Sequence, residues 1–126
     1  MRVGIISRTD KQKALDVARE ILETLKVKYE VYLDETLNKH FPNANYSKKS
    51  GDVDLLISVG GDGTILKSVR RYRDTPLLGV NMGTIGYLNE VSSEEIKSIP
   101  YILENHTIEE RSMISCKIGN RTVEAL

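Results

Sequence analysis

Residues 54–64 read Asp-Leu-Leu-Ile-Ser-Val-Gly-Gly-Asp-Gly-Thr, and this stretch decides the fold class. Residues 54–59 form a nearly continuous apolar run, which is typical of a central parallel strand covered on both faces. The run leads directly into Gly60, Gly61 and Gly63, and a helical pattern follows. A buried strand, a glycine loop and a helix in that order predict one unit of an open α/β sheet.

The residues before this stretch show the same order of elements. Residues 3–7 are apolar and of strand length, and Thr9-x-x-Gln12 is a capping-box pattern that predicts the start of a helix. Apolar residues then recur at helical spacing, which gives that helix one buried face. Apolar and polar residues alternate over residues 27–33, which predicts a second strand, and residues 38–51 indicate a polar loop.

The alternation of strands and helices continues after the glycine loop. The next helix is predicted to bury Ile65, Leu66, Val69 and Tyr72. A strand over residues 75–80 and a second glycine-containing loop over residues 81–87 follow, and Ser92-x-x-Glu95 predicts another helix, which Pro100 interrupts or restarts. The whole pattern predicts an α/β fold with a doubly wound, Rossmann-like parallel sheet.

The pattern changes near the end of the sequence. Residues 108–126 read as two strands joined by a two-residue turn at Gly119-Asn120, which indicates a β-hairpin. A hairpin with nothing beyond it leaves one edge unpaired and one face uncovered, which natural domains avoid. We therefore expect an α/β nucleotide-binding domain over residues 1–106 and the truncated beginning of a β-rich domain over residues 107–126.

The composition favours a local binding site over a general surface field. The 126 residues suffice for one α/β domain with a core, and 18 basic and 18 acidic residues cancel. We therefore expect no nucleic-acid partner, and no apolar run approaches the roughly 20 residues that span a membrane. The single cysteine, Cys116, fits a reducing compartment. We expect a soluble, cytoplasmic protein.

The first glycine loop has the properties of a phosphate cradle. Gly60, Gly61 and Gly63 have no side chains, so backbone amides can approach phosphate oxygens, and the following helix adds the positive potential of its N-terminus. The loop also lies at the carboxyl end of a parallel strand, the edge at which open α/β sheets bind ligands. These three glycines are candidate nucleotide-binding residues.

Asp62 is the informative residue of this loop, because bound phosphates repel a carboxylate. In phosphoryl transfer an acidic residue can accept the proton of the attacking hydroxyl or hold Mg²⁺ through water. The alternative is a structural one, in which Asp62 caps a helix that starts near Thr64. The residue types leave both interpretations open.

Thr64 and Lys67 are further candidates with structural alternatives. Lys67 lies one helical turn beyond Gly63, so its ammonium group can lean back toward a phosphate, or it can be a solvated surface lysine. Thr64 can donate its hydroxyl to a phosphate or a ribose, or only close the first turn of the helix.

Two sequence motifs together point to a family. The first loop matches neither the GxxxxGK[ST] pattern of a P-loop nor the GxGxxG fingerprint of dinucleotide-binding proteins. It resembles the Gly-Gly-Asp-Gly-Thr motif of a kinase superfamily that contains NAD kinases, diacylglycerol and sphingosine kinases, and 6-phosphofructokinases. The second loop, Asn81-x-Gly83-x-x-Gly86-Tyr87-Leu88, resembles the NxGxxGFL segment of NAD kinases. The resemblance covers nearly the whole chain.

The resemblance implies a reaction and roles for the candidate residues. NAD kinases transfer a phosphoryl group from ATP or polyphosphate, with Mg²⁺, to the adenosine ribose 2′-hydroxyl of NAD and produce NADP. By carry-over, Asp62 is the base, Gly63 and Lys67 line the NAD site, Asn81 and Gly83 shape its wall, and Tyr87, a Phe in the family, stacks near the adenine.

The resemblance also implies what this chain lacks. The Asn-Glu motif of the family lies later, in the β domain, so Asn89-Glu90 is not that motif. We therefore expect a homo-oligomer, a dimer or tetramer, for the full-length protein and no activity for this chain by itself. The alternatives are a lipid kinase, which would lack the NxGxxGFL segment, and a nucleotide-binding module without catalysis.

Overall fold

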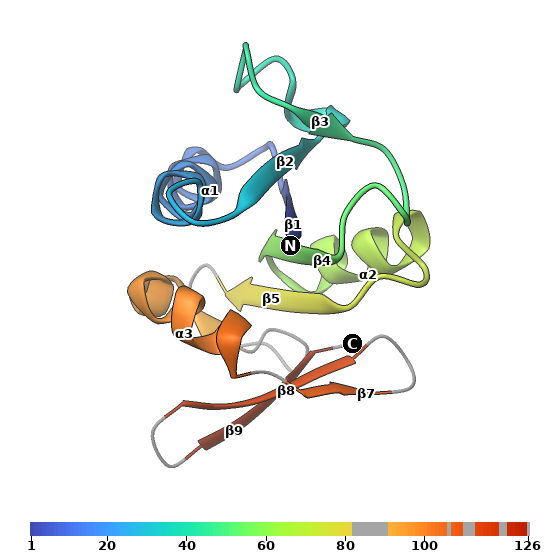
Figure 1. Ribbon diagram of the computed structural model, residues 1–126. Coiled ribbons are helices and arrows are strands. Elements are labelled where there is room, and N and C mark those ends of the chain that lie inside the picture. The colour runs from blue at the N-terminus through green and yellow to red at the C-terminus, as the bar shows by residue number, and fades with distance from the viewer. Residues whose placement is uncertain (82–90, 106, 110–112, 119–120, 126) are drawn as a thin grey trace.

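The computed structural model describes residues 1–81, 91–105, 107–109, 113–118 and 121–125 (Figure 1). The helices are α1 (Gln12–Leu25), α2 (Asp62–Arg71) and α3 (Ile99–Glu104), with the 3-10 helices η1 (Glu35–Leu37) and η2 (Ser93–Ser98). The strands are β1 (Arg2–Ser7), β2 (Glu30–Asp34), β3 (Tyr46–Ser47), β4 (Leu55–Gly60), β5 (Leu77–Asn81), β6 (Val91–Ser92), β7 (Thr107–Glu109), β8 (Met113–Ile118) and β9 (Arg121–Ala125).

A parallel sheet forms the centre of the molecule. Its strands follow the order β3-β2-β1-β4-β5, and every neighbouring pair in this series is parallel. From β1 the chain runs to one side through α1, and it later returns to the other side of β1 to form β4. The carboxyl ends of β1 and β4 therefore form the topological switch point of the sheet, where open α/β sheets bind ligands.

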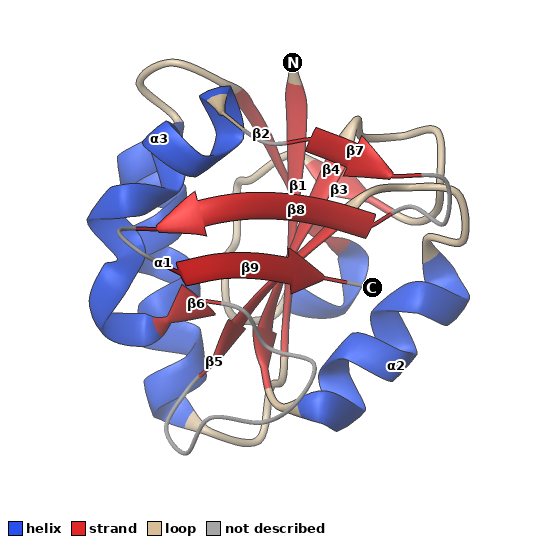
Figure 2. Ribbon diagram, turned by 90° about the horizontal axis from the view of Figure 1, so that it is seen from below, coloured by secondary structure: helices blue, strands red, loops and turns tan. Residues whose placement is uncertain are grey.

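Helices cover both faces of this sheet, with α1 and α3 on one side and α2 on the other (Figure 2). Ile21 of α1 and Ile102 of α3 belong to the same core cluster as Ile57 of β4. Ile65 of α2 belongs to a second cluster with Leu56 of β4. Successive residues of β4 point to opposite faces, and both faces are buried, which explains the continuous apolar run. The predicted doubly wound α/β fold is confirmed.

The last three strands form an antiparallel ribbon beside β5. In Figure 2 they run across the direction of the parallel strands, and β8 pairs with β5 in parallel at Met113 and Leu77. β8 and β9 pair antiparallel up to Ile118 and Arg121, which confirms the predicted hairpin. The first predicted strand is wrong in extent, because Thr107–Glu109 form a separate strand, β7, that pairs antiparallel with β8. Its turn residues, 119–120, lie outside the described residues.

Two predictions about the first helix and the second strand are wrong in detail. The capping box at Thr9 and Gln12 is not formed, because α1 begins at Gln12 with Lys11 at the N-cap, and the Gln12 side-chain amide donates to Asp16 Oδ1 at 2.9 Å. The second strand begins at Glu30 and not at residue 27. The residues before Glu30 instead close the end of α1.

The predicted inner face of α2 is half right. Ile65 and Tyr72 are buried, but Leu66 and Val69 are 52% and 37% exposed. Ser68 takes the inward position, because its hydroxyl is satisfied by Thr64 O at 2.6 Å and by a 3.0 Å hydrogen bond to a serine of β4. A polar residue whose hydroxyl is hydrogen-bonded locally can take an inward position on a helix, although a prediction from apolar spacing gives the inward positions to apolar residues.

A buried carboxylate ties α2 to the edge of the sheet. Asp34, at the end of β2, is fully buried and accepts hydrogen bonds from Tyr72 Oη at 2.5 Å and Arg71 Nη2 at 3.1 Å. The Tyr72 hydroxyl is also 2.9 Å from the hydroxyl of Ser47 in β3. Burial and the hydrogen bond to Asp34 raise the pKa of Tyr72 well above its usual value. One polar cluster therefore joins β2, β3 and α2.

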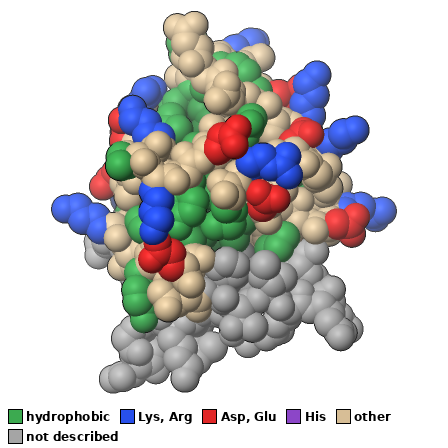
Figure 3. All heavy atoms as spheres, viewed as in Figure 1, with side chains coloured by type: hydrophobic (Ala, Val, Ile, Leu, Met, Phe, Trp, Pro, Cys, Tyr) green, Lys and Arg blue, Asp and Glu red, His purple; other side chains and the backbone are tan. Residues whose placement is uncertain are grey.

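The surface carries both signs of charge. On the face shown in Figure 3, Lys and Arg side chains lie among Asp and Glu side chains, in keeping with the equal numbers of basic and acidic residues. None of the helices in the described part of the chain has the length and apolar composition needed to cross a bilayer.

Candidate functional site

The first glycine loop connects the carboxyl end of β4 to the start of α2. Gly60 ends β4 with φ +150°, and a Cβ atom there would lie 2.5 Å from Thr64 Oγ1. Gly60 therefore cannot be replaced without strain or movement of Thr64. Gly61 is the N-cap of α2, and its carbonyl accepts from the amides of Thr64 at 3.1 Å and Ile65 at 3.2 Å. These bonds form the first turn of the helix.

Gly61 and Gly63 differ from Gly60 in their surroundings. A Cβ atom at either position would have no heavy-atom neighbour within 4 Å. The space beside both residues is open, so a ligand can approach their backbones. This is the property expected of glycines in a phosphate cradle.

Asp62 is the first residue of α2 and is half-buried. The N-cap position of α2 belongs to Gly61. The structural alternative, in which Asp62 caps a helix that starts near Thr64, is therefore wrong. A carboxylate in the first turn is compatible with the positive potential of the helix N-terminus. Asp62 thus stands at the end of the helix that faces the glycine loop.

A pocket of about 390 Å³ lies in front of this loop. Two segments line it: the end of β1 with the residues after it, and the glycine loop with the first turns of α2. The lining residues are Ser7, Arg8, Thr9, Asp10, Gly61, Gly63, Thr64 and Lys67. Because β1 and β4 are neighbours, this pocket lies at the switch point of the sheet.

Lys67 and Thr64, which are predicted site residues, both line this pocket. Lys67 is exposed and Thr64 is half-buried. The pocket therefore brings together Gly61, Gly63, Thr64 and Lys67, whereas Gly60 and Asp62 are not among the described residues that line it.

The segment after β1 is not among the predicted site residues, yet it forms one wall of the pocket. The Arg8 amide donates to Val59 O at 3.0 Å, so the segment begins beside the end of β4. Arg8 Nε and Nη2 donate to the two carboxylate oxygens of Asp10 at 2.7 and 2.8 Å. The Arg8 guanidinium lowers the pKa of Asp10 to about 2. The rule that ligands bind at carboxyl ends of strands, applied to residues 3–7 as well, would have indicated this wall.

The second glycine loop is only partly described. Asn81 ends β5, and its backbone is paired with Gly60 of β4, so the second loop starts beside the first. The remaining predicted residues of this loop, Gly83 and Tyr87, lie outside the described residues. Their predicted roles stay predictions.

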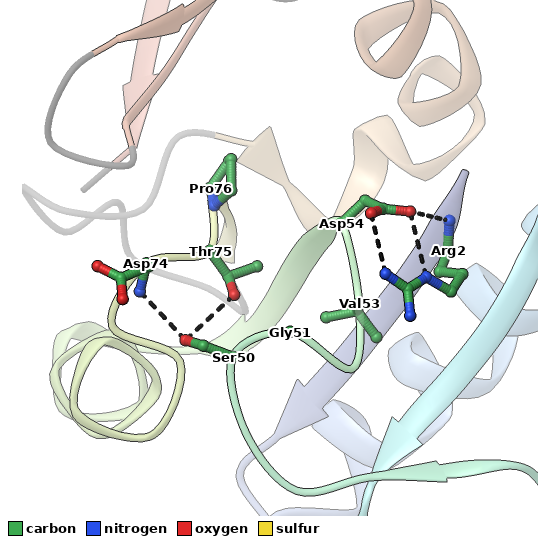
Figure 4. A pocket seen from close by; sticks show the side chains of 8 residues that line it. All are labelled: Arg2, Ser50, Gly51, Val53, Asp54, Asp74, Thr75 and Pro76. Atoms are coloured by element: carbon green, nitrogen blue, oxygen red, sulfur yellow. Dashed lines mark hydrogen bonds and ion pairs between the residues drawn. The ribbon is translucent and has the colours of Figure 1, made fainter.

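A second pocket, of about 460 Å³, lies at the opposite, amino-terminal edge of the sheet (Figure 4). Its side chains include the ion pair of Arg2 and Asp54, with Nη2 and Oδ1 3.2 Å apart. The hydroxyl of Ser50 accepts hydrogen bonds from the Asp74 amide and the Thr75 hydroxyl. None of the predicted site residues in the described part of the chain lines this pocket.

The fold and the first pocket define a class: an open α/β domain with a glycine-rich loop, a pocket and a nearby carboxylate, Asp62, at the switch point of the sheet. The family model described as the ATP-NAD kinase N-terminal domain matches residues 3–107. The chain belongs to the NAD kinase family.

Individual relatives agree with this assignment. The chain is 43% identical to an NAD kinase of Thermococcus sibiricus over 90% of its own length and 44% of the relative's length. It is 38% identical to an NAD kinase of Pyrococcus furiosus, over 100% of this chain and 49% of that protein. The chain thus spans about half the length of these relatives.

A solved structure with the same fold is that of yeast NADH kinase complexed with NADH. Its TM-score to this chain is 0.68 at 18% sequence identity, and the similarity covers 99% of this chain and 46% of the yeast chain. At this identity the likeness concerns the fold.

Proposed function

We propose that the protein that contains this chain is an NAD kinase, which transfers a phosphoryl group to the adenosine ribose 2′-hydroxyl of NAD and produces NADP. The observation that supports this most directly is the position of Asp62. It begins α2 directly after a glycine loop at the switch point of the sheet, in a chain of the NAD kinase family. The yeast relative in fold, which was solved with NADH, supports a dinucleotide as the acceptor.

In this proposal Asp62 is the general base. It accepts the proton of the 2′-hydroxyl while that oxygen bonds to the phosphorus and the bond between the phosphorus and the donor oxygen breaks. The amides of the glycine loop and the N-terminus of α2 stabilise the negative charge of the phosphates. Lys67 adds a mobile positive charge from the same helix.

The second loop is proposed to form the acceptor side of the site. The backbone of Asn81 pairs with Gly60, and this supports a position of the second loop beside the proposed phosphate cradle. We propose that Asn81 and Gly83 form its wall and that Tyr87 stacks near the adenine. The tyrosine keeps an aromatic face for stacking and adds a hydroxyl that needs a partner.

Mg²⁺ is proposed to enter with the donor, ATP or polyphosphate. This ion keeps most of its waters and contacts proteins through one or two carboxylates together with substrate phosphates. Asp62 is the carboxylate of the loop that fits such a contact. In the described part of the chain no three His, Cys, Asp or Glu side chains are grouped as a metal site.

The remaining proposals concern the whole protein. We propose an α/β domain over residues 1–106 and a β-rich domain that begins at residue 107, because β7, β8 and β9 form an antiparallel ribbon. We further propose that the full-length protein is a homo-oligomer, a dimer or tetramer, in the cytoplasm.

The test is NADP formation by the full-length protein and its Asp62→Asn variant, with NAD, Mg²⁺ and either ATP or polyphosphate. We expect the parent to make NADP and the variant to lose at least about a hundredfold in rate. A parent that binds nucleotide but makes no NADP with either donor would contradict the proposal and favour a lipid kinase or a non-catalytic binding module.

A further inference from the structure

We propose that Arg8 binds phosphate oxygens of the nucleotide ligand, so that the pocket holds phosphates between two loops and not on the glycine loop alone. The inference deepens the proposed function and rests on it for the identity of the ligand. Its own evidence is the position, orientation and charge of Arg8.

The position of Arg8 is fixed by the sheet. Its backbone amide donates to Val59 O at 3.0 Å, one residue before the glycine loop begins. Its Cδ atom lies 3.4 Å from the place that a Cβ atom on Gly60 would take. The aliphatic part of the side chain therefore lies against the glycine loop, and Arg8 lines the same pocket as Gly61 and Gly63.

The orientation of the guanidinium is set by Asp10. The two bonds to Asp10 use Nε–H and one N–H of Nη2, out of the five donors of a guanidinium. Within the described residues no acceptor is found for the other three. The planar guanidinium is held by Asp10 along one edge, and its remaining N–H donors lie on the other edges. This arrangement suits bidentate recognition of a phosphate group. The pair is also accessible, with Arg8 and Asp10 side chains 37% and 67% exposed.

The charges around the pocket favour an anion. Arg8 lines it from the segment after β1 and Lys67 from α2, and among the described lining residues only Asp10 is acidic. The pocket at the other edge offers the contrast, because its described lining residues include two carboxylates, Asp54 and Asp74, and one cation, Arg2 (Figure 4). Neither the glycine loop nor the N-terminus of a described helix contributes to that lining as far as the structure describes it.

Two ligands of the proposed reaction carry such phosphates: the diphosphate of NAD and the phosphate chain of the donor. The chemistry of recognition is the same for both, a guanidinium fork on phosphate oxygens. Separate titrations therefore have to distinguish them.

The experiment compares the full-length parent with Arg8→Ala, Arg8→Lys and Arg2→Ala. Arg2 is the matched control, because it begins β1, the strand that Arg8 directly follows, and forms the same kind of ion pair, with Asp54, at the opposite edge. For each protein the dissociation constants of NAD and of MgATP are measured separately by calorimetric titration. Thermal unfolding shows which variants keep the parent's stability, and NADP formation is recorded in parallel.

We expect Arg8→Ala to weaken binding of NAD or of MgATP at least about tenfold, which is the loss of a charge-assisted hydrogen bond. Arg8→Lys should lose less, because it keeps the charge without the fork. Arg2→Ala should change neither constant more than about twofold. The ligand that weakens identifies whose phosphates Arg8 holds.

Unchanged binding of both ligands by a folded Arg8→Ala variant overturns the inference, and so does an equal loss in Arg2→Ala. If Arg8→Ala fails to fold, the Arg8→Lys variant is used for the same comparison. Unchanged dissociation constants of NAD and MgATP in Arg8→Lys then contradict a role of the guanidinium in phosphate binding. A parent that makes no NADP refutes the proposed function instead, while the titrations still decide on Arg8.

Discussion

At the scale of single residues, Gly60 and Gly63 of the first loop are expected to have different roles, which substitution by alanine can separate. Gly63 lines the pocket and has open space where a Cβ atom would be. We expect Gly63→Ala to leave the free energy of unfolding within about 1 kcal/mol of the parent, because alanine suits a helix. The new methyl group should weaken NAD binding at least about tenfold by blocking phosphate approach. Urea unfolding and an NAD titration measure the two effects.

Gly60→Ala is the matched comparison. Its methyl group would meet the Thr64 hydroxyl, and its backbone has φ +150°. We expect this variant to lose about 2 kcal/mol of stability or more, since strain of this kind costs about 1–3 kcal/mol before the clash is counted. Normal NAD binding by Gly63→Ala would show that phosphates do not approach that part of the loop.

The sequence indicates site residues where the residue type itself limits the chemistry. Glycines between a buried strand and a helix, with an aspartate among them, can be recognised because few other arrangements need them. Arg8 could not be recognised in this way, because an arginine after a strand is usually solvated. Its importance depends on β1 being the neighbour of β4, and strand order does not follow from local patterns.

At the scale of elements, the buried cluster around Asp34 holds α2 against β2 and β3. We expect Tyr72→Phe to cost about 1–3 kcal/mol of unfolding free energy, because it leaves a buried carboxylate with one donor fewer. Nucleotide affinity should change little, since Tyr72 does not line the pocket. Tyr32→Phe is the control, because its hydroxyl donates to Glu30 at 2.6 Å on the surface. A cost for Tyr32→Phe as large as that for Tyr72→Phe would contradict this account.

The same cluster predicts a loss of stability in alkali. The pKa of Tyr72 is raised in the folded state, first by burial and then by its hydrogen bond to Asp34. The neutral phenol therefore stabilises the fold fully below the unfolded pKa of about 10, and this contribution is lost as the pH rises above that value. The urea concentration at the midpoint of unfolding is measured from pH 8 to 11.5. Above pH 10 it should fall less steeply with pH in Tyr72→Phe than in the parent. If the midpoints of both proteins fall equally with pH, another group and not Tyr72 causes the loss of stability in alkali.

The order and type of the main elements could be predicted because apolar periodicity reports burial. The errors occur where polar groups find local partners. Ser68 faces inward because Thr64 and Ser58 satisfy its hydroxyl, and Leu66 consequently faces out. The short strand β3 lies within the predicted loop over residues 38–51, because two residues are too few to give a strand pattern.

At the scale of the whole molecule, the alternation of elements in the sequence predicts the doubly wound sheet. It does not predict which two strands flank the binding pocket. The alternation of strands and helices is enough to predict that helices cover both faces of the sheet and that ligands bind at the carboxyl ends of its strands. The choice of β1 and β4 as the two sides of the pocket needs the observed strand order. Residues 82–90, which hold the rest of the second loop, lie outside the described structure.

The full-length protein is expected to need both halves of its chain for activity. The relatives are about twice as long as this chain, which contains the glycine loop, the proposed phosphate cradle, and Asp62. Phosphoryl transfer needs the acceptor hydroxyl aligned with the donor, and contacts from the remaining half are proposed to supply that alignment. We expect the 126-residue chain alone to unfold cooperatively in urea but to form NADP at least about a hundredfold more slowly than the full-length protein. Both are assayed with the same NAD, Mg²⁺ and donor concentrations. Equal rates would mean that these 126 residues contain the complete site, and the proposed two-domain arrangement would have to be abandoned.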